Sequence, residues 1–250
     1  MDLVYNNILS KVTAGHKLMA VLIDPDKMKF DDVPNFIQKT NRSIATHIFV
    51  GGSEVDEGIT QKLVDEIKKR TDLPVVLFPG DVTQISEEAD ALLFLSLISG
   101  RNPEYLIGKQ IEAASKLIAS NLEVIPTGYI LIQNGKETSV QRVTETQPLS
   151  RNNIQEIVHT AKAGELLGMK IIYLEAGSGA TLPINSEIIK CVKAVLDIPL
   201  IVGGGIRSID QLEDAYKAGA DLVVMGTVFE ENESMFNNLK NETVKYGSNH

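Results

Sequence analysis

The stretch LIVGGGIRSIDQLEDAYKAGADLVVMGT, residues 200–227, predicts one complete strand–helix–strand unit. Its two ends, LIV and LVVM, are unbroken apolar runs, which are typical of parallel strands buried on both faces. Between them, Ser208 and Gln211 have the spacing of a capping box that opens a helix, and this helix is expected to end near Gly219. A helix that joins two parallel strands is the repeating unit of α/β folds.

The same pattern recurs along the whole chain. Apolar runs that we expect to be strands lie at 18–23, 47–50, 75–78, 91–97, 124–132, 171–174, 200–202 and 222–225. Helical spacing separates most of them: Val55, Ile59, Leu63 and Ile67 fall four apart, and residues 154–161 repeat the pattern. Eight such units in about 250 residues predict a (β/α)8 TIM barrel, with a doubly wound open sheet as the alternative.

No linker rich in Pro, Gly or Ser divides the chain. We therefore expect residues 1–250 to form a single (β/α)8 barrel domain, with the last residues, 247–250, frayed at its end. The exception to the regular pattern is the long polar stretch 133–149. Its Asn134-Gly135 pair is compatible with a hairpin turn, and a loop of this length beside a barrel mouth is expected either to act as a lid or to be a surface excursion.

The composition excludes several classes of protein. With 43% hydrophobic residues, the 250-residue chain can bury a full core. A net charge of -9 and a pI near 5.0 argue against a broad basic face for nucleic acid, although a local phosphate site needs only a few donors. The single cysteine, Cys191, excludes a disulfide framework and is expected to pack rather than to react. Without a signal-peptide pattern or a transmembrane segment, the chain is expected to be soluble and cytoplasmic.

Glycines follow the last two predicted strands. Because the active site of a (β/α)8 barrel lies at the C-terminal ends of its strands, Gly204, Gly205, Gly226 and Thr227 are candidates for a backbone cradle that binds phosphate. The alternative is that these glycines only form tight turns. The segment Gly177-Ser178-Gly179 can add further N–H groups and a hydroxyl to the same pocket.

A carboxylate ends the sixth predicted strand. Glu175 follows Tyr173 by two residues, so both side chains project to the same side, and Ala176 and Gly177 leave room for a ligand. Glu175 is our candidate general base, able to take a proton from a substrate hydroxyl beside the phosphate site. The alternative is a surface carboxylate at the start of a loop.

Oxygen ligands for a metal follow the first two strands. Asp24 and Ser53 are of the type that Mg²⁺ prefers, although Asp24-Pro25-Asp26 is also a turn sequence and Ser53 with Asp56 is also a helix cap. The four histidines offer no pair at metal-ligand spacing. The apolar residues 92–97 are expected to belong to the barrel core or to line a prenyl groove.

Together these motifs resemble one family. The chain has DPDK at 24–27, GGS at 51–53, YLEAGSG at 173–179, GGGI at 203–206 and GT at 226–227. This combination resembles the geranylgeranylglyceryl phosphate synthases over nearly the whole chain, and YLEAGSGA is its most specific part. The resemblance implies a (β/α)8 barrel prenyltransferase that joins sn-glycerol 1-phosphate to a polyprenyl diphosphate. The product is an ether lipid precursor, and the family uses Mg²⁺ and commonly forms oligomers.

The resemblance also implies a role for each matching residue. Asp24 and Ser53 would bind Mg²⁺, and Glu175 would activate the glycerol hydroxyl. The glycerol phosphate would be held by Tyr173, Leu174, Glu175, Ala176, Gly177, Ser178, Gly179, Gly204, Gly205, Gly226 and Thr227. In one respect the chain departs from the pattern, because some related synthases carry a lysine two residues before the first-strand aspartate, where this chain has Leu22.

Two other functions are compatible with the same glycines. A phosphate-sugar isomerase or aldolase on this barrel would share the cradle but need no long apolar groove, and a Schiff-base aldolase would need a strand-end lysine, for which Lys27 is a weak candidate. A non-catalytic protein that binds a phosphate ligand would keep the cradle and tolerate the loss of Glu175.

Overall fold

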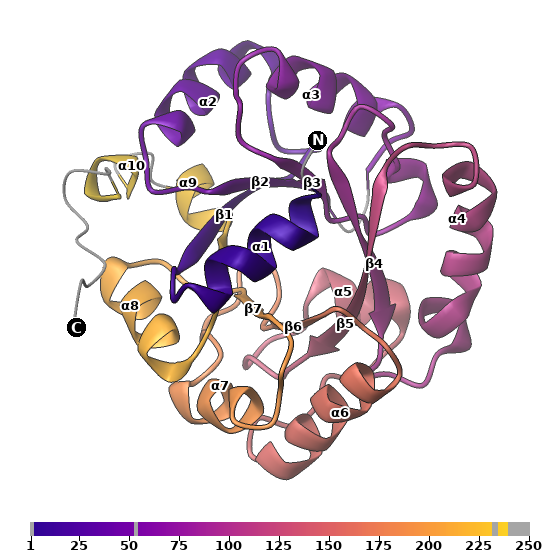
Figure 1. The fold of residues 1–250 in the computed structure, drawn as a ribbon, viewed down its shortest axis with the longest axis vertical. Coiled ribbons are helices and arrows are strands. Elements are labelled where there is room, and N and C mark those ends of the chain that lie inside the picture. The colour runs from indigo at the N-terminus through magenta and orange to yellow at the C-terminus, as the bar shows by residue number, and fades with distance from the viewer. Residues whose placement is uncertain (1–2, 53–54, 232–234, 240–250) are drawn as a thin grey trace.

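Eight parallel strands close into a barrel in the computed structural model, which describes residues 3–52, 55–231 and 235–239 (Figure 1). The strands are β1 Leu18–Ile23, β2 His47–Val50, β3 Val75–Leu77, β4 Ala91–Leu97, β5 Glu123–Leu131, β6 Ile171–Glu175, β7 Leu200–Gly203 and β8 Leu222–Met225. Each strand pairs with the next along the chain, and β8 pairs with β1. The predicted (β/α)8 barrel is confirmed, and the open-sheet alternative is wrong.

Helices surround the ring of strands (Figure 1). They are α1 Val4–Thr13, α2 Val33–Asn41, α3 Ile59–Lys68, α4 Lys109–Leu117, α5 Ser139–Thr144, α6 Ile154–Leu166, α7 Ser186–Lys193, α8 Ile209–Ala218, α9 Thr227–Glu231 and α10 Met235–Asn238. Three short helical segments are η1 Phe30–Asp32, η2 Val82–Gln84 and the π-helical turn η3 Glu104–Gly108. Within the described ranges, no helix is both long and apolar enough to cross a bilayer.

The local signals account for most of the element boundaries. Ser208 caps α8 by accepting the N–H of Gln211, and Gly219 ends the helix in the left-handed conformation. Helix α3 contains Ile59, Leu63 and Ile67 of the predicted helical spacing but not Val55, because Gly58 adopts a φ of 79° and the helix begins only after it. Two further predictions concern residues outside those that the structure describes: the role of Ser53 as a metal ligand or helix cap, and the frayed end at 247–250.

The expected hairpin after residue 132 is also wrong. Thr138 accepts the N–H of Gln141 and thereby caps α5, so residues that a hairpin would place in a strand are helical instead. Gly135 still provides a turn, with a φ of 95°. In this loop, helix capping by Thr138 therefore outweighs the hairpin turn that the Asn-Gly pair favours.

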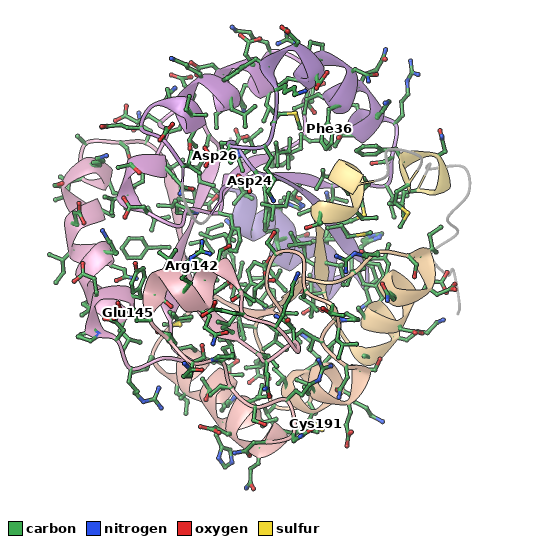
Figure 2. The ribbon with its side chains drawn as sticks, turned by 180° about the vertical axis from the view of Figure 1, so that it is seen from behind. Asp24, Asp26, Phe36, Arg142, Glu145 and Cys191 are labelled. Atoms are coloured by element: carbon green, nitrogen blue, oxygen red, sulfur yellow. The ribbon has the colours of Figure 1, made fainter. Side chains whose placement is uncertain are left out.

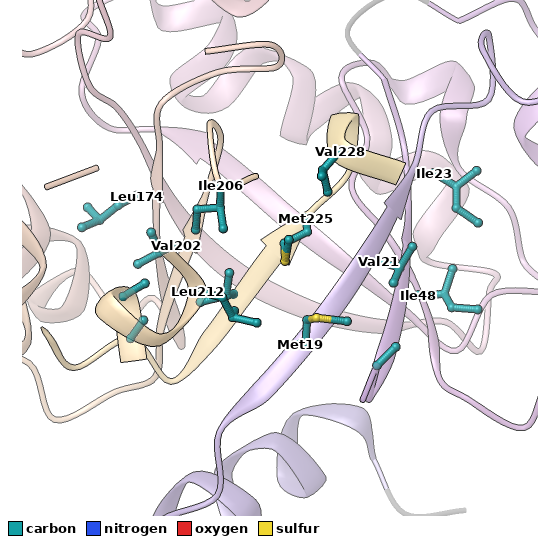
Figure 3. Close-up of a cluster of buried hydrophobic side chains, with 14 of the residues drawn as sticks. Met19, Val21, Ile23, Ile48, Leu174, Val202, Ile206, Leu212, Met225 and Val228 are labelled. Carbon is teal, nitrogen blue, oxygen red and sulfur yellow. The ribbon is translucent and has the colours of Figure 1, made fainter. Parts of the chain in front are cut away.

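Two hydrophobic layers hold the barrel together. Alternate strand residues face outward to the helices, as Figure 3 shows for Val21, Leu174 and Val202. The inward-facing residues form a second cluster, which Val4 and Ile8 of α1 join from the N-terminal end of the strands. In Figure 1, α1 lies across this end of the ring, so the barrel interior is covered there and the site forms at the opposite end.

The barrel wall is incomplete between β3 and β4. Strand β3 has three residues and β4 has seven, and they pair only through Val76 with Ala91 and Leu77 with Leu92. Residues 93–97 therefore have a paired neighbour only in β5. On the unpaired side, the Gln110 side chain of α4 donates a hydrogen bond to the carbonyl of Leu95 in place of a strand.

His47 gives a test of the packing at the start of β2. Its ring is fully buried, Nδ1 lies 2.8 Å from the Thr46 hydroxyl, and Nε2 has no hydrogen-bond partner in the described chain. Burial lowers the pKa of His47 to about 3, so the native ring stays neutral while the unfolded ring gains a proton below pH 6.5. Stability from this residue is present above pH 6.5 and is lost as the pH falls toward 3.

We expect urea unfolding to show a decrease of about 2 kcal/mol in stability between pH 6.5 and 5.0 from this residue, at about 1.4 kcal/mol per pH unit. His47→Gln should lose that part of the pH dependence. The exposed His159 on α6 supplies the control, since His159→Gln should behave as the wild type. An unchanged pH dependence in His47→Gln would show that another group titrates.

Candidate active site

The C-terminal ends of the strands surround a cavity with a volume of about 200 Å³. From the loops after β6, β7 and β8, it is lined by Glu175, Gly177, Ser178, Gly204, Gly205, Arg207, Gly226 and Thr227. From β4, α4 and α5, it is lined by Leu92, Leu93, Phe94, Leu95, Leu97, Ala113, Val140 and Val143. Strand order places these groups on different sides of the barrel, so the cavity has a polar end and an apolar end.

Glu175 lies at the polar end, with 5% of its surface exposed. Strand alternation directs both Glu175 and Tyr173 into the barrel, as predicted. Burial raises the pKa of Glu175 to about 7, and two neighbours partly offset this effect: the N–H of Gly177, 2.5 Å from Oε1, and the Tyr173 hydroxyl. A carboxyl with this pKa can exist in both protonation states near neutral pH, as a general base must.

The side chains of Tyr173 and Glu175 occupy space that is free only because Gly203, on the neighbouring strand, has no side chain. A Cβ atom at Gly203 would lie 2.4 Å from the Tyr173 hydroxyl and 2.9 Å from Oε2 of Glu175. The Tyr173 hydroxyl is buried and has no partner at hydrogen-bond geometry among the described residues. It lies close enough to Glu175 to lower the pKa of that carboxyl, and it lines the cavity, where it can also contact a ligand.

The backbone beside Glu175 forms a cradle of N–H groups. In the described chain, no hydrogen bond engages the backbone N–H groups of Ser178, Gly179, Gly204 or Gly205. Gly204 has a φ of 84°, and a Cβ atom there would lie 2.4 Å from Oε1 of Glu175. Unpaired N–H groups in such a turn form an anion-binding concavity. These glycines therefore form tight turns and also leave backbone N–H groups unpaired at the cavity.

Two positively charged side chains beside the cradle were not predicted from the sequence. Arg207 lines the cavity and donates from Nη1 to the carbonyl of Ala180 at 2.6 Å. The Lys136 ammonium lies 3.3 Å from where a Cβ atom of Gly179 would be. Arg207 follows the GGGI motif directly, so its position offered a signal. Nothing in the sequence showed that Lys136 folds back onto residues 177–179.

Some predicted ligand-binding residues do not face the cavity. The side chains of Leu174 and Ala176 belong to the outer hydrophobic cluster, and Figure 3 shows Leu174 in that layer. Gly179 is also absent from the cavity lining. These three residues can therefore offer the site only backbone groups. Of these groups, the N–H of Gly179 is unpaired in the described chain, whereas the N–H of Ala176 already donates to the carbonyl of Gly203.

Asp24 lies at the end of β1 and lines the cavity. Figure 2 shows it toward the middle of the ring, seen from the end opposite α1. The carboxylate pairs with Lys27 at 3.2 Å and accepts the N–H of Asp26, so the predicted turn also forms. A Cβ atom at Gly52 would lie 2.6 Å from Oδ1, so the loop after β2 approaches Asp24 closely.

The donor set suits a hard cation that retains water. The described residues contain no group of three or more His, Cys, Asp or Glu side chains that could hold a metal ion. Mg²⁺ commonly uses one or two carboxylates together with water and substrate phosphates. Asp24 at a phosphate-binding cavity fits that pattern. Cys191 does not take part, because it lies on α7 in the outer helical layer (Figure 2).

The apolar end of the cavity passes through the barrel wall. Leu93 and Leu97 face inward and Leu92 faces outward, yet all three line the cavity, which therefore uses the opening between β3 and β4. Val140 and Val143 of α5 contribute to the lining. The segment 133–149 thus contacts the cavity and is no mere surface excursion. Leu92, Leu93 and Leu97 are buried core residues, as expected, and they also line the apolar end of the cavity.

The fold and this site define a class: (β/α)8-barrel proteins with an anion cradle after the last strands. Residues 12–244 match the model of the PcrB family. The geranylgeranylglyceryl phosphate synthase of Flavobacterium johnsoniae is 53% identical over 233 residues, which cover 93% of this chain and 96% of that protein. The synthase of Pyrococcus abyssi is 40% identical over 229 residues, 91% of this chain and 90% of that protein.

Solved structures of similar proteins have the same fold as this chain. The chain superposes with a TM-score of 0.90 and 33% identity on (S)-3-O-geranylgeranylglyceryl phosphate synthase from Thermoplasma acidophilum in complex with substrate sn-glycerol-1-phosphate, covering 96% of each chain. For wild-type GGGPS from Thermoplasma volcanium, the TM-score is 0.89 at 32% identity. This chain belongs to the PcrB family, and the resemblance drawn from its motifs is confirmed.

The cradle can be tested with inorganic phosphate as the ligand. Gly204→Ala should weaken phosphate binding at least tenfold in calorimetric titration, because the new methyl group would collide with Glu175 and strain a left-handed residue. Gly15→Ala is the matched control, since Gly15 also has a positive φ but no atom within 4 Å of the added Cβ. Equal phosphate binding by the two variants would reject the cradle.

Proposed function

We propose that this protein joins sn-glycerol 1-phosphate to a polyprenyl diphosphate, forming a prenyl-glycerol ether and releasing diphosphate. The observation that carries the proposal is the buried Glu175 between an anion cradle and an apolar cavity. The names of the relatives support it, as does the substrate named for the Thermoplasma acidophilum structure.

The polar end accounts for glycerol phosphate binding. The phosphate would accept hydrogen bonds from the unpaired backbone N–H groups, while Arg207 and Lys136 supply positive charge in a protein of net charge -9. The glycerol hydroxyls would then lie near Tyr173 and Glu175. The assigned ligand groups are Tyr173, Glu175, Ser178 and the backbone of Leu174, Ala176, Gly177, Gly179, Gly204, Gly205, Gly226 and Thr227.

The apolar end accounts for the prenyl chain. A hydrocarbon tail gains about 25 cal/mol for each Å² of apolar surface removed from water, and the opening beside β4 gives it a path out of the barrel. Leu22 lines the cavity where some relatives carry lysine, so the diphosphate would draw on Lys27 and Lys109, which also line the cavity. The geranylgeranyl donor is the proposed substrate because the relatives carry its name.

Asp24 would hold Mg²⁺ together with the diphosphate, and the sequence-based assignment of Ser53 as a second ligand remains part of this proposal. When bound, the ion would neutralise charge on the leaving diphosphate. Around it, the protein orients the reactants: the cradle fixes the glycerol phosphate, and the apolar walls exclude water from the allylic carbon.

The chemical step follows from these positions. The bond between C1 of the prenyl chain and the diphosphate oxygen breaks, and its electron pair leaves with diphosphate. The 3-hydroxyl oxygen of glycerol phosphate forms a new bond to C1, and its proton passes to the Glu175 carboxylate. Glu175 later releases this proton to solvent, so the site returns to its starting state.

Specific observations disfavour the competing functions. A phosphate-sugar isomerase or aldolase would have no use for an apolar cavity that crosses the barrel wall. Lys27 is half-exposed and pairs with Asp24 at 3.2 Å, whereas a Schiff-base lysine is typically desolvated or next to another cation. A purely binding protein would not require a buried carboxyl with a pKa near 7 beside its ligand.

Two further expectations belong to the same proposal. Association of several copies of the chain is expected from the family resemblance, and light scattering of the purified protein would measure it. A cytoplasmic location fits the single cysteine, Cys191, which is free, because a reducing compartment needs no disulfides.

The deciding experiment incubates the purified protein with Mg²⁺, sn-glycerol 1-phosphate and radiolabelled geranylgeranyl diphosphate, then extracts labelled ether lipid. Farnesyl and longer donors test the reach of the apolar cavity, and sn-glycerol 3-phosphate tests stereochemical preference. Labelled product that requires both the metal and the 1-phosphate supports the proposal. Absence of product with every donor, while glycerol phosphate still binds, would favour a non-catalytic role.

Glu175→Gln should reduce kcat at least 100-fold while leaving the binding of glycerol phosphate within a few-fold, because general base catalysis contributes about 10²- to 10⁴-fold. In the wild type, kcat/KM should rise with pH through about 7, since Glu175 acts only when deprotonated. Calorimetry and a pH–rate profile measure the two effects. Near-normal turnover by Glu175→Gln would exclude it as the base.

Asp24→Asn should raise the Mg²⁺ concentration needed for half-maximal activity at least tenfold, because a neutral amide is a weaker ligand than a carboxylate. Asp26→Asn is the control: it changes the neighbouring carboxylate of the same turn, whose residue does not line the cavity. A metal titration of activity compares the two variants, and identical curves for Asp24→Asn and the wild type would reject the assignment.

A further inference from the structure

The loop after β5 contacts the Glu175 loop through one buried amide. Asn134 is 1% exposed, and its Nδ2 donates to the carbonyl of Ala176. Its Oδ1 accepts the backbone N–H of Lys136 at 3.2 Å. These partners fix the orientation of the amide, because rotating it by half a turn would place acceptor against acceptor and donor against donor.

The carbonyl that Asn134 binds is part of the peptide unit that also binds Glu175. A peptide unit is planar and rigid, so the C=O of Ala176 and the N–H of Gly177 turn together. That N–H donates to Oε1 of Glu175 at 2.5 Å. A continuous chain of hydrogen bonds therefore runs from the Asn134 amide through the peptide to the carboxylate.

The packing around this peptide leaves it little freedom. Gly177 has a φ of 101°, and a Cβ atom there would lie 2.2 Å from Cγ2 of Thr138. Thr138 itself is held by its hydrogen bond from the N–H of Gln141 at the start of α5. The loop after β5 thus contacts both sides of the peptide, through Asn134 at the carbonyl and Thr138 at the following Cα.

We infer that Asn134 is a positioning residue, which holds the peptide between Ala176 and Gly177 so that its N–H points at Glu175. The inference rests on the proposed function, in which Glu175 accepts the substrate proton. Its physical consequence is specific: an N–H that donates to a carboxylate stabilises the ionised form. Without Asn134, the carbonyl of Ala176 loses its buried partner, and the contact with Thr138 alone no longer fixes the direction of the N–H.

The ionisation of Glu175 can be followed directly by NMR, in protein labelled with ¹³C at the glutamate carboxyl carbons. The resonance that disappears in Glu175→Gln identifies Glu175. Its titration midpoint should lie near 7 in the wild type and rise by about one pH unit in Asn134→Ala, because the lost hydrogen bond no longer favours the anion. Asn134→Gln keeps an amide donor, so its midpoint should lie closer to the wild-type value than that of Asn134→Ala.

Asn153→Ala is the matched control, because it removes a side-chain hydrogen bond to a helix N-terminus away from Glu175 and should leave the midpoint unchanged. If Asn134→Ala does not fold, Asn134→Leu supplies a variant of similar shape without the amide. A folded Asn134→Ala or Asn134→Leu protein with the wild-type midpoint would overturn the inference.

Turnover separates this inference from the proposed function. The acid limb of the pH profile for kcat/KM should move upward together with the NMR midpoint. A shifted midpoint in Asn134→Ala combined with full activity of Glu175→Gln would support Asn134 as a positioning residue but reject Glu175 as the base. A loss of activity that is equal at every pH, with an unshifted midpoint, would mean that Asn134 only supports the fold.

Discussion

The burial of Glu175 at the end of β6 is the constraint around which the rest of the site is arranged. An ionised carboxylate in an apolar barrel is costly unless donors compensate for the lost water. Here the N–H of Gly177 and the Tyr173 hydroxyl provide that compensation, but only in part, because the pKa still rises to about 7. Partial compensation is what allows the carboxyl to exchange a proton near neutral pH.

The same constraint explains the glycines on the neighbouring strand. Side chains at Gly203 and Gly204 would overlap Tyr173 and Glu175, so the buried carboxyl group requires small residues there. Glycine in the left-handed conformation also leaves backbone N–H groups unpaired, which forms the anion cradle. The buried carboxyl group and the cradle are thus two results of one packing requirement, and they lie close together.

A second feature, the short strand β3, decides where the apolar end of the cavity opens. The interior of a (β/α)8 barrel is normally a filled core. Because β3 ends early, β4 loses a neighbour beyond Leu92, and α4 covers the opening with Gln110 bound to the free carbonyl of Leu95. This carbonyl thus remains hydrogen-bonded while the wall stays open, and the apolar end of the cavity lies at the opening.

The sequence by itself determined the barrel and the polar centre of the site. Continuous apolar runs located every strand to within a residue or so, and alternation along β6 placed Tyr173 and Glu175 on one side. The same alternation implied that Leu174 points away, which the family pattern did not reveal. These features depend on neighbours along the chain, whose periodicity is visible in sequence.

Only the tertiary structure decided which distant groups act on that centre. Asn134 and Lys136 lie about 40 residues before the loop that they contact, and Gln110 compensates for a strand that is too short. The pKa of Glu175 depends on burial by the whole barrel, which no local pattern specifies. Contacts of this kind arise from the closure of the ring, which brings together loops that the sequence keeps apart.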